Sequence, residues 1–244
     1  MENAELIGLS RQTALRRQMD VVANNLANIS TSGYKAERSL FSEYVMPVAE
    51  ASTFRMEDRD LSYVWDRGTM TDFASGSVKL TGNPLDVALS EDAFFVIETE
   101  AGLRYTRNGA FQINPEGFLT NSEGMPVQGE GGPISFNNAE TDISIAADGT
   151  ISSSAGVKDK LQAVTFDSPQ LLSREGNSLF SGEGANPVQA AFTQGALEGS
   201  NIKGVIEITE MIQVSRAYQS LANMLKRIDD LRQGAVQKLG SVQA

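Results

Sequence analysis

Two narrow apolar seams, one at each end of the chain, constrain the fold more than any other feature. The N-terminal seam steps by 4, 3, 4 and 3 positions through Leu15, Met19, Val22, Leu26 and Ile29. The C-terminal seam steps by 3, 4, 3, 4 and 3 positions through Met211, Val214, Tyr218, Leu221, Leu225 and Ile228. These are the a and d spacings of a coiled coil, so they predict a helix at each end. Such narrow seams favour pairing with each other and with neighbouring subunits over packing on a central domain.

Both predicted helices have recognisable boundaries. Thr31-Ser32-Gly33 would stop the first helix, with Gly33 as its C-terminal cap. Ser200 or Asn201 would cap the start of the last helix.

Three asparagines, Asn24, Asn25 and Asn28, surround the seam residue Leu26. Asparagine is a poor choice for a solvent-facing helix position, whereas a buried amide can fix the register of paired helices. A specific packing surface is therefore favoured over ordinary exposed residues. We include the three asparagines with the seam residues in one predicted assembly interface.

The stretch between the seams has the pattern of β-structure. Phe94-Phe95-Val96-Ile97 is an apolar run of strand length, and alternating segments at 105–107 and 111–113 flank Asn108-Gly109, a strong hairpin signal. Further turns are predicted at 114–117 and at Asp148-Gly149. Short strands at such close spacing predict an all-β sandwich or barrel-like domain.

The expected fold class is a mainly β central domain with N- and C-terminal α-helices that pair as a coiled coil. Its domains would be an N-terminal coiled-coil helix over 1–35, an extended linker over 36–76, an all-β domain over 77–190, and a C-terminal linker and coiled-coil helix over 191–244.

The charge of the chain is concentrated in its middle. The formal net charge is −11, with four basic and three acidic residues in 1–35, six and four in 201–244, and ten and 24 between them. No segment offers the basic face that nucleic acid requires. An acidic body between two neutral ends indicates a solvated domain carried by associating segments. No apolar run has the length of a membrane span, so we expect no membrane insertion, and the start lacks the pattern of a secretory signal.

The composition leaves little room for catalysis. The chain has no cysteine and no histidine, which removes thiolate nucleophiles, histidine bases and the commonest zinc ligands. A carboxylate pair among Asp86, Glu91 and Asp92 is the remaining enzymatic option, but solvated acids in a turn are favoured. We therefore expect no enzyme activity and no cofactor or metal.

Three ordered motifs resemble the signatures of the flagellar rod and hook proteins. They are Ala23-Asn24-Asn25-Leu26-Ala27-Asn28 with Thr31-Ser32-Gly33-Tyr34-Lys35, then Thr81-Gly82-Asn83-Pro84-Leu85-Asp86-Val87-Ala88 with Tyr105-Thr106-Arg107-Asn108-Gly109, and finally Leu197-Glu198-Gly199-Ser200-Asn201-Ile202 with Arg216-Ala217-Tyr218-Gln219. The opening residues 7–17 and Gln219 look more like the proximal-rod members than the distal-rod ones. Ser90-Glu91-Asp92-Ala93 departs from the glycine-containing turn of relatives.

The resemblance implies a structural subunit of the proximal rod, part of the torque-transmitting drive shaft in the periplasm. Such a protein would leave the cell through the flagellar export apparatus without a cleaved signal peptide. It would polymerise with copies of itself and with other rod proteins, its terminal helices forming an inner coiled-coil tube and its β domain an outer layer. The alternatives are a distal-rod or hook subunit, a carboxylate-dependent hydrolase with coiled-coil ends, and a secreted adhesin.

Overall fold

A computed structural model of the chain describes residues 2–46, 61–90, 92–137 and 140–241. The chain divides into two compact units. Unit 1 comprises Met1–Leu26, Glu37–Met70 and Lys203–Ala244, and unit 2 comprises Ala27–Ala36 and Thr71–Ile202.

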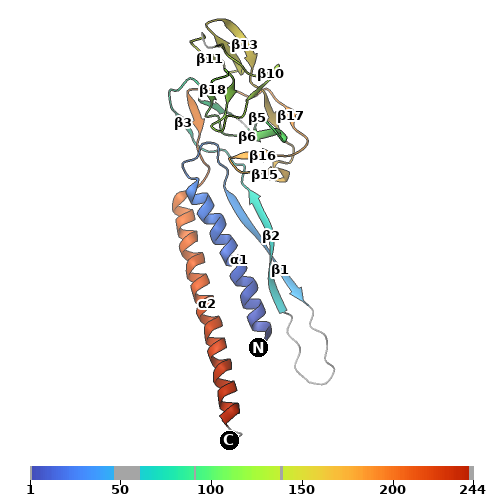
Figure 1. Ribbon diagram of the computed structural model, residues 1–244, viewed down its shortest axis with the longest axis vertical. Helices are drawn as coiled ribbons and strands as arrows, with labels where there is room; N and C mark the ends of the chain where they lie inside the picture. The colour runs from blue at the N-terminus through green and yellow to red at the C-terminus, as the bar shows by residue number, and fades with distance from the viewer. Residues whose placement is uncertain (1, 47–60, 91, 138–139, 242–244) are drawn as a thin grey trace. The chain divides into compact units, whose positions relative to one another are not determined.

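Unit 1 contains two helices among its described residues, and they lie side by side in opposite directions (Figure 1). They are α1 (Glu2–Ala27) and α2 (Gly204–Ser241). Gly8 allows a close approach, because a Cβ at this position would lie 2.6 Å from the Leu225 side chain. Further along, the Gln18 amide donates a hydrogen bond of 2.8 Å to Glu210. No helix among the described residues combines the length and apolar character needed to cross a membrane.

A β-hairpin completes unit 1. Strands β1 (Glu37–Met46) and β2 (Leu61–Thr71) pair with each other in a two-stranded sheet (Figure 1). They lie in the segment 36–76 that was expected as an extended linker. The alternation typical of a strand is blurred there because both faces of the hairpin carry large apolar residues, such as exposed Leu40 and Trp65 and the partly buried Val64.

Unit 2 is built on a six-stranded antiparallel sheet with buried side chains on both faces. The strands in spatial order are β15 (Ser173–Arg174), β16 (Leu179–Ser181), β6 (Gly102–Thr106), β5 (Phe94–Thr99), β14 (Ala163–Thr165) and β17 (Asn186–Pro187). Phe94 and Val96 of β5 enter one apolar cluster, and Phe95 and Ile97 enter the other. Burial on both faces explains the continuous apolar run, and the predicted strand is confirmed.

Shorter ladders surround this sheet. They are β3 (Val78–Leu80) with β19 (Ala196–Glu198), β4 (Val87–Leu89) with β18 (Phe192–Gln194), β7 (Gln112–Ile113) with β8 (Leu119–Thr120), β9 (Gln128–Gly129) with β10 (Gly132–Pro133), and β11 (Ser144–Ile145) with β12 (Thr150–Ser153) and β13 (Gly156–Lys160). A 3₁₀ turn, η1 (Pro169–Leu171), precedes β15. The described chain is thus a mainly β body with an N-terminal and a C-terminal helix, as predicted.

The predicted hairpin at Asn108-Gly109 is wrong. Strand β6 pairs with β5 and β16, while β7 pairs with β8. Gly109 is required for space: a Cβ there would lie 1.8 Å from the carbonyl oxygen of Val87. The other two predicted turns are confirmed, with Gly117 between β7 and β8 and Gly149 between β11 and β12, at φ of 90° and 88°.

The predicted helix caps also need correction. Helix α1 ends at Ala27, and Gly33 adopts its left-handed φ of 66° in a later turn. Helix α2 begins at Gly204, after both predicted caps. Asn201 instead accepts a hydrogen bond from the Ala36 amide and donates to the carbonyl oxygen of Asp72. Its side chain therefore joins two other chain segments and does not start a helix.

Candidate assembly surface

Most residues of the predicted assembly interface lie on α1 and α2. Val22 and Val214 are buried. The half-buried positions are Leu15, Met19, Leu26, Asn28, Met211, Tyr218, Leu221, Leu225 and Ile228. Asn24 and Ile29 are exposed, and Asn28 and Ile29 follow the end of α1. Contacts between the two helices therefore cover the seams in part and leave area on them for further packing.

Asn25 is the buried amide of the predicted interface. Its Nδ2 donates to the carbonyl oxygen of Glu37, at 2.8 Å, and to Glu207 Oε2, at 3.2 Å. Its Oδ1 accepts from the Glu37 backbone N–H, at 3.0 Å. One side chain thus connects α1 to the first residue of β1 and to the first turn of α2. The role of Glu207, which is also buried, was missed from the sequence, although an acidic residue in the first turn of a helix is a usable signal.

A second face of α1 packs against the hairpin. Ala14 and Val21 are buried although they lie outside the predicted seam. Arg17 Nε forms an ion pair of 2.8 Å with Asp66 of β2. The apolar stripe of α1 is therefore wider than a coiled-coil seam, because the helix has a partner on two sides.

The helices also carry large apolar side chains on their exposed surfaces. Leu6 and Leu9 are exposed on α1, and on α2 the exposed residues are Val205, Ile206, Ile208, Ile212, Met224, Leu231 and Val236. Val205 and Leu231 are 82% and 72% exposed. Apolar residues in this number on one pair of helices indicate a surface for another protein.

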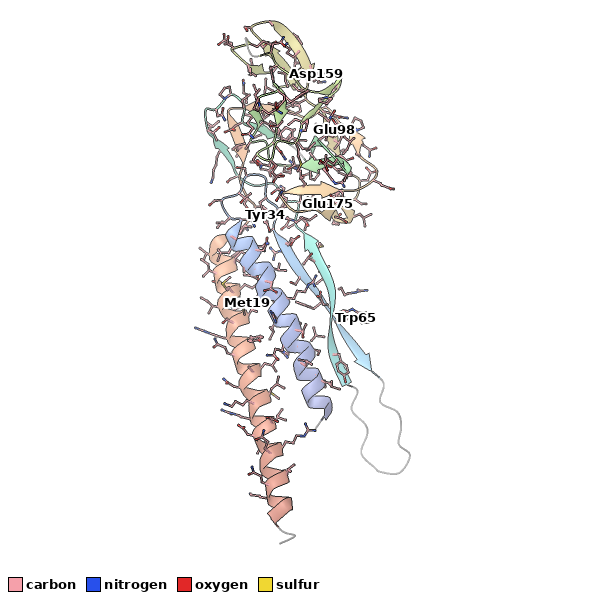
Figure 2. The ribbon with its side chains drawn as sticks, in the orientation of Figure 1. Met19, Tyr34, Trp65, Glu98, Asp159 and Glu175 are labelled. Carbon is pink, nitrogen blue, oxygen red and sulfur yellow. The ribbon has the colours of Figure 1, made fainter. Side chains whose placement is uncertain are left out.

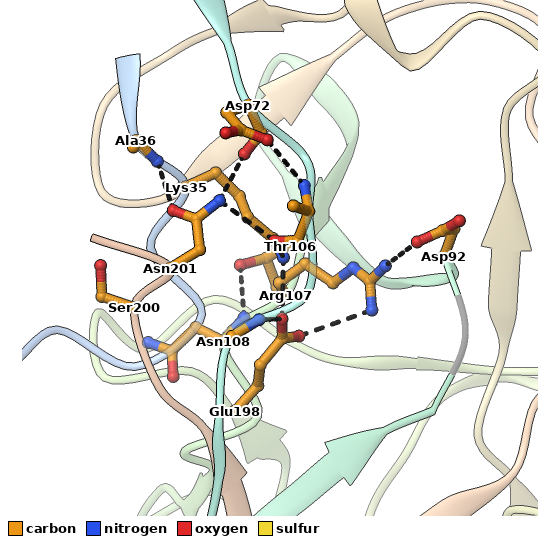
Figure 3. A network of polar contacts seen from close by, with 12 residues as sticks. Lys35, Ala36, Asp72, Asp92, Thr106, Arg107, Asn108, Glu198, Ser200 and Asn201 are labelled. Atoms are coloured by element: carbon orange, nitrogen blue, oxygen red, sulfur yellow. Dashed lines mark hydrogen bonds and ion pairs between the residues drawn. The ribbon is translucent and has the colours of Figure 1, made fainter. Parts of the chain in front are cut away.

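A buried cluster of charges lies in unit 2 (Figure 3). Lys35 Nζ lies 2.7 Å from Glu198 Oε1, and the exposed fractions of these side chains are 1% and 3%. Lys35 also donates to the carbonyl oxygen of Ala74, and Glu198 accepts from the Gly76 N–H, both at 2.8 Å. Arg107 reaches the second Glu198 oxygen at 3.5 Å. One carboxylate thus holds two buried cations.

Burial sets the electrostatics of this cluster. Loss of water around the cation lowers the pKa of Lys35, against the opposing hydrogen bond and charge of Glu198. Burial likewise lowers the pKa of Arg107, with Glu198 and then Asp92 opposing the shift. Asp92 lies 3.6 Å from Arg107 at the solvent edge, and the guanidinium lies 5.1 Å from the centre of the Phe94 ring. Both cations depend on Glu198 as their buried counter-charge.

The three sequence motifs meet at this cluster. Lys35, Arg107 and Glu198 each come from a different motif. The Gly33 N–H donates to the carbonyl oxygen of Glu198, at 2.8 Å, and a Cβ on Gly33 would lie 2.3 Å from the Asn108 nitrogen. The motifs were recognised from the sequence, but their contacts with one another were not.

The acids considered for catalysis are not arranged as a pair. Asp86 is buried in a turn, where its Oδ1 accepts a hydrogen bond of 3.0 Å from Asn83. The Asp92 side chain is 85% exposed beside Arg107. Glu91 lies outside the described residues. In the described chain these acids serve a turn and a surface ion pair.

Paired terminal helices with exposed apolar faces, joined to a β body, define a structural subunit that assembles with others. The chain matches three family models: "Flagella basal body rod protein" over 6–35, "Flagellar hook protein FlgE/F/G D1 domain" over 88–153, and "Flagellar basal body rod FlgEFG protein C-terminal" over 193–238. It is 35% identical to the flagellar basal-body rod protein FlgF of Caulobacter vibrioides, over 99% of this chain and 100% of that protein.

Other relatives agree with this match. The FlgF of Mesorhizobium japonicum is 32% identical over 99% of both chains, and the FlgG of Bacillus subtilis is 29% identical over 94% of this chain and 96% of that protein. The chain belongs to the flagellar basal-body rod protein family and is of the FlgF type. It is a structural protein of the basal-body rod.

Proposed function

We propose that this chain is a subunit of the proximal rod and polymerises through its terminal helices. In the assembled rod, the seams of α1 and α2 pair as a coiled coil within the subunit and with helices of adjacent subunits. Many such contacts, repeated around the shaft, transmit torque. The role is structural and involves no catalytic step.

The observation that carries the proposal is the exposed apolar surface of α2. Because Gly8 lies opposite Leu225, roughly ten C-terminal residues of α2 extend beyond the start of α1 at the usual helical rise. Val236 is exposed there, and the exposed Leu231 lies level with the first residue of α1. Full burial of one such side chain contributes about 1.5–3 kcal/mol, so a few of them per interface supply a substantial driving force for assembly.

The partners follow from family membership and from this surface. We propose that copies of this chain and other rod proteins cover the apolar faces, and that the flagellar export apparatus delivers the chain to the periplasm without signal cleavage. The acidic charge of unit 2, with seven basic and 17 acidic residues, keeps the β body solvated outside the helical layer.

Electron microscopy of basal bodies from a strain that lacks the gene tests the proposed position. Rods that end just beyond the inner-membrane ring are expected. Complete rods without hooks would instead indicate the distal-rod or hook alternative, which complementation of each paralogue deletion would also reveal. Intact, motile flagella would contradict a rod function.

Point variants test the role of the helices. Leu231→Asp is expected to remove the protein from isolated basal bodies while its circular dichroism and melting temperature stay close to wild type, because Leu231 is exposed in the single subunit. Gln219→Asp, at an exposed polar position of α2, is the matched control. Normal incorporation of Leu231→Asp would contradict assembly through this face.

A further inference from the structure

The two faces of the β1–β2 hairpin have different surroundings. Val64 and Asp66 line a pocket with residues of α1, and Glu37 and Thr69 line another. These four side chains therefore define the inner face of the hairpin, toward α1. Asp66 and Thr69 both line these pockets, and Gly68 between them adopts a φ of 109°.

The outer face of the hairpin is exposed, apolar and basic. By alternation it carries Arg38 and Leu40 from β1, and Trp65 and Arg67 from β2. Trp65, which is labelled in Figure 2, is 58% exposed. Leu40 and Met70 of the same two strands are also exposed. Tryptophan and arginine are the residues most enriched where protein interfaces gain their affinity. The outer face therefore has the composition of a binding surface.

Unit 2 carries a groove that is acidic and partly apolar, and it is therefore complementary in charge to the outer face of the hairpin. It has a volume of about 720 Å³ and is bordered by the carboxylates of Glu98, Glu100, Glu123 and Glu175, two of which are labelled in Figure 2. Arg104 forms an ion pair with Glu175, so the formal charge of the lining is −3. Met125, Pro126 and Leu179 supply apolar lining for a large side chain.

The net charges of the two units also favour contact between the hairpin and unit 2 of different copies. Unit 2, with seven basic and 17 acidic residues, has a formal charge of −10, whereas unit 1, with 13 and 14, has −1. Two copies of unit 2 repel each other because both are acidic. The arginines on the outer face of the hairpin, in contrast, attract the carboxylates of unit 2.

We propose that the outer face of the hairpin of one copy docks into the acidic groove of unit 2 of a second copy. Trp65 and Leu40 contact the apolar lining, while Arg38 and Arg67 pair with the groove carboxylates. The inference rests on the proposed self-assembly and adds a second contact to it, between hairpin and β body, outside the helices.

Cysteine cross-linking in isolated basal bodies tests this contact, because the natural chain has no cysteine. A strain would carry Arg67→Cys and Glu123→Cys in one chain, both at exposed positions, and its basal bodies would be treated with a short bis-maleimide. Covalent species with the mass of two or more copies are expected. The matched control replaces Glu123→Cys by Glu116→Cys, which is exposed outside the groove and should give at least tenfold less product.

The outcomes separate the two proposals. If the wild-type chain is absent from basal bodies of the parent strain, the rod proposal fails. If it is present but the groove pair gives no more product than the control, the docking proposal alone fails. A product with the mass of this chain and another rod protein would overturn the assignment of the groove to a second copy.

Charge reversal in the natural, cysteine-free chain supplies an independent test. The pair Arg38→Glu with Arg67→Glu, or the pair Glu100→Arg with Glu123→Arg, should each lower the number of copies per basal body by about tenfold, because attractions become repulsions. A chain with all four reversals should recover wild-type numbers. Failure of that recovery, with all variants folded by circular dichroism, would refute the pairing.

Discussion

Replacement of Glu198 by glutamine should destabilise unit 2 more than any other single change in its charged cluster. The variant keeps the shape of the side chain but removes the only buried counter-charge that the described structure gives to Lys35 and Arg107. Loss of one partner from a buried ion pair costs about 3–5 kcal/mol. At about 2–4 °C per kcal/mol for a chain of this size, the melting temperature should fall by roughly 6–20 °C.

Lys35→Met should cost less, because Glu198 would keep Arg107 at 3.5 Å and the Gly76 N–H at 2.8 Å. The double variant, Lys35→Met with Glu198→Gln, should lose less stability than the sum of the two single losses. It no longer contains Lys35, the cation that Glu198→Gln alone would leave buried without its carboxylate. Thermal and urea unfolding of the purified proteins, followed by circular dichroism, would measure all three. Glu116→Gln, at an exposed position of the same unit, is the control.

The difference in stability between wild type and Glu198→Gln should depend on pH in a defined direction. Burial already lowers the pKa of Lys35 below its unfolded value, and loss of Glu198 should lower it further. The cost of burying the cation is therefore full below the folded pKa and is relieved as pH rises from the folded pKa toward the unfolded one. The stability gap between wild type and Glu198→Gln should narrow over that interval of rising pH. A loss below about 1 kcal/mol at pH 7, or a gap independent of pH, would refute a buried counter-charge role.

Four other variants test separate features. Gly109→Ala should cost at least about 1–3 kcal/mol, because its methyl group would lie 1.8 Å from a carbonyl oxygen of β4. Gly234→Ala, in open space on α2, should stabilise the helix by up to about 1 kcal/mol, and urea unfolding measures both. Hydrogen bonds, first of all from Lys158, lower the pKa of Glu140, so its contribution is present above the unfolded pKa and lost as pH falls through the folded one; the difference in melting temperature between wild type and Glu140→Gln should shrink in acid. Asn25→Ala removes three hydrogen bonds in unit 1 and should cost about 1–3 kcal/mol, with faster hydrogen exchange at the start of β1 and unchanged exchange in unit 2.

Local sequence patterns predicted the helices and strands in which burial of the side chains follows a regular pattern along the chain. The spacing of Val22 and Val214 with their neighbours predicted the helices, and the run at Phe94 predicted a strand buried on both faces. The hairpin of unit 1 was not predicted, because its strands have apolar residues on both faces without being buried on both. Gly109 was misread, because a glycine required for close backbone approach looks the same in a sequence as one required for a turn.

The charged cluster could not be predicted from any local pattern. Lys35 and Glu198 are 163 positions apart, and nothing near either residue indicates burial of a charge. Their membership of separate motifs was visible, but a motif does not say which other motif it contacts. Asn25 was easier to select, because an amide in the middle of a helix already conflicts with helix propensity.

The hydrogen bonds around Glu198 also determine how unit 2 would respond to a pull on its ends. The segments through which the chain enters and leaves this unit are fastened to one another, by Gly33 to Glu198 and by Ala36 to Asp72 and Asn201. A force applied through both terminal segments would therefore pass along a few short bonds and bypass the six-stranded sheet. The force at which unit 2 begins to unfold would be set by these hydrogen bonds. The β body could then vary in size without lowering the force that the assembled rod withstands.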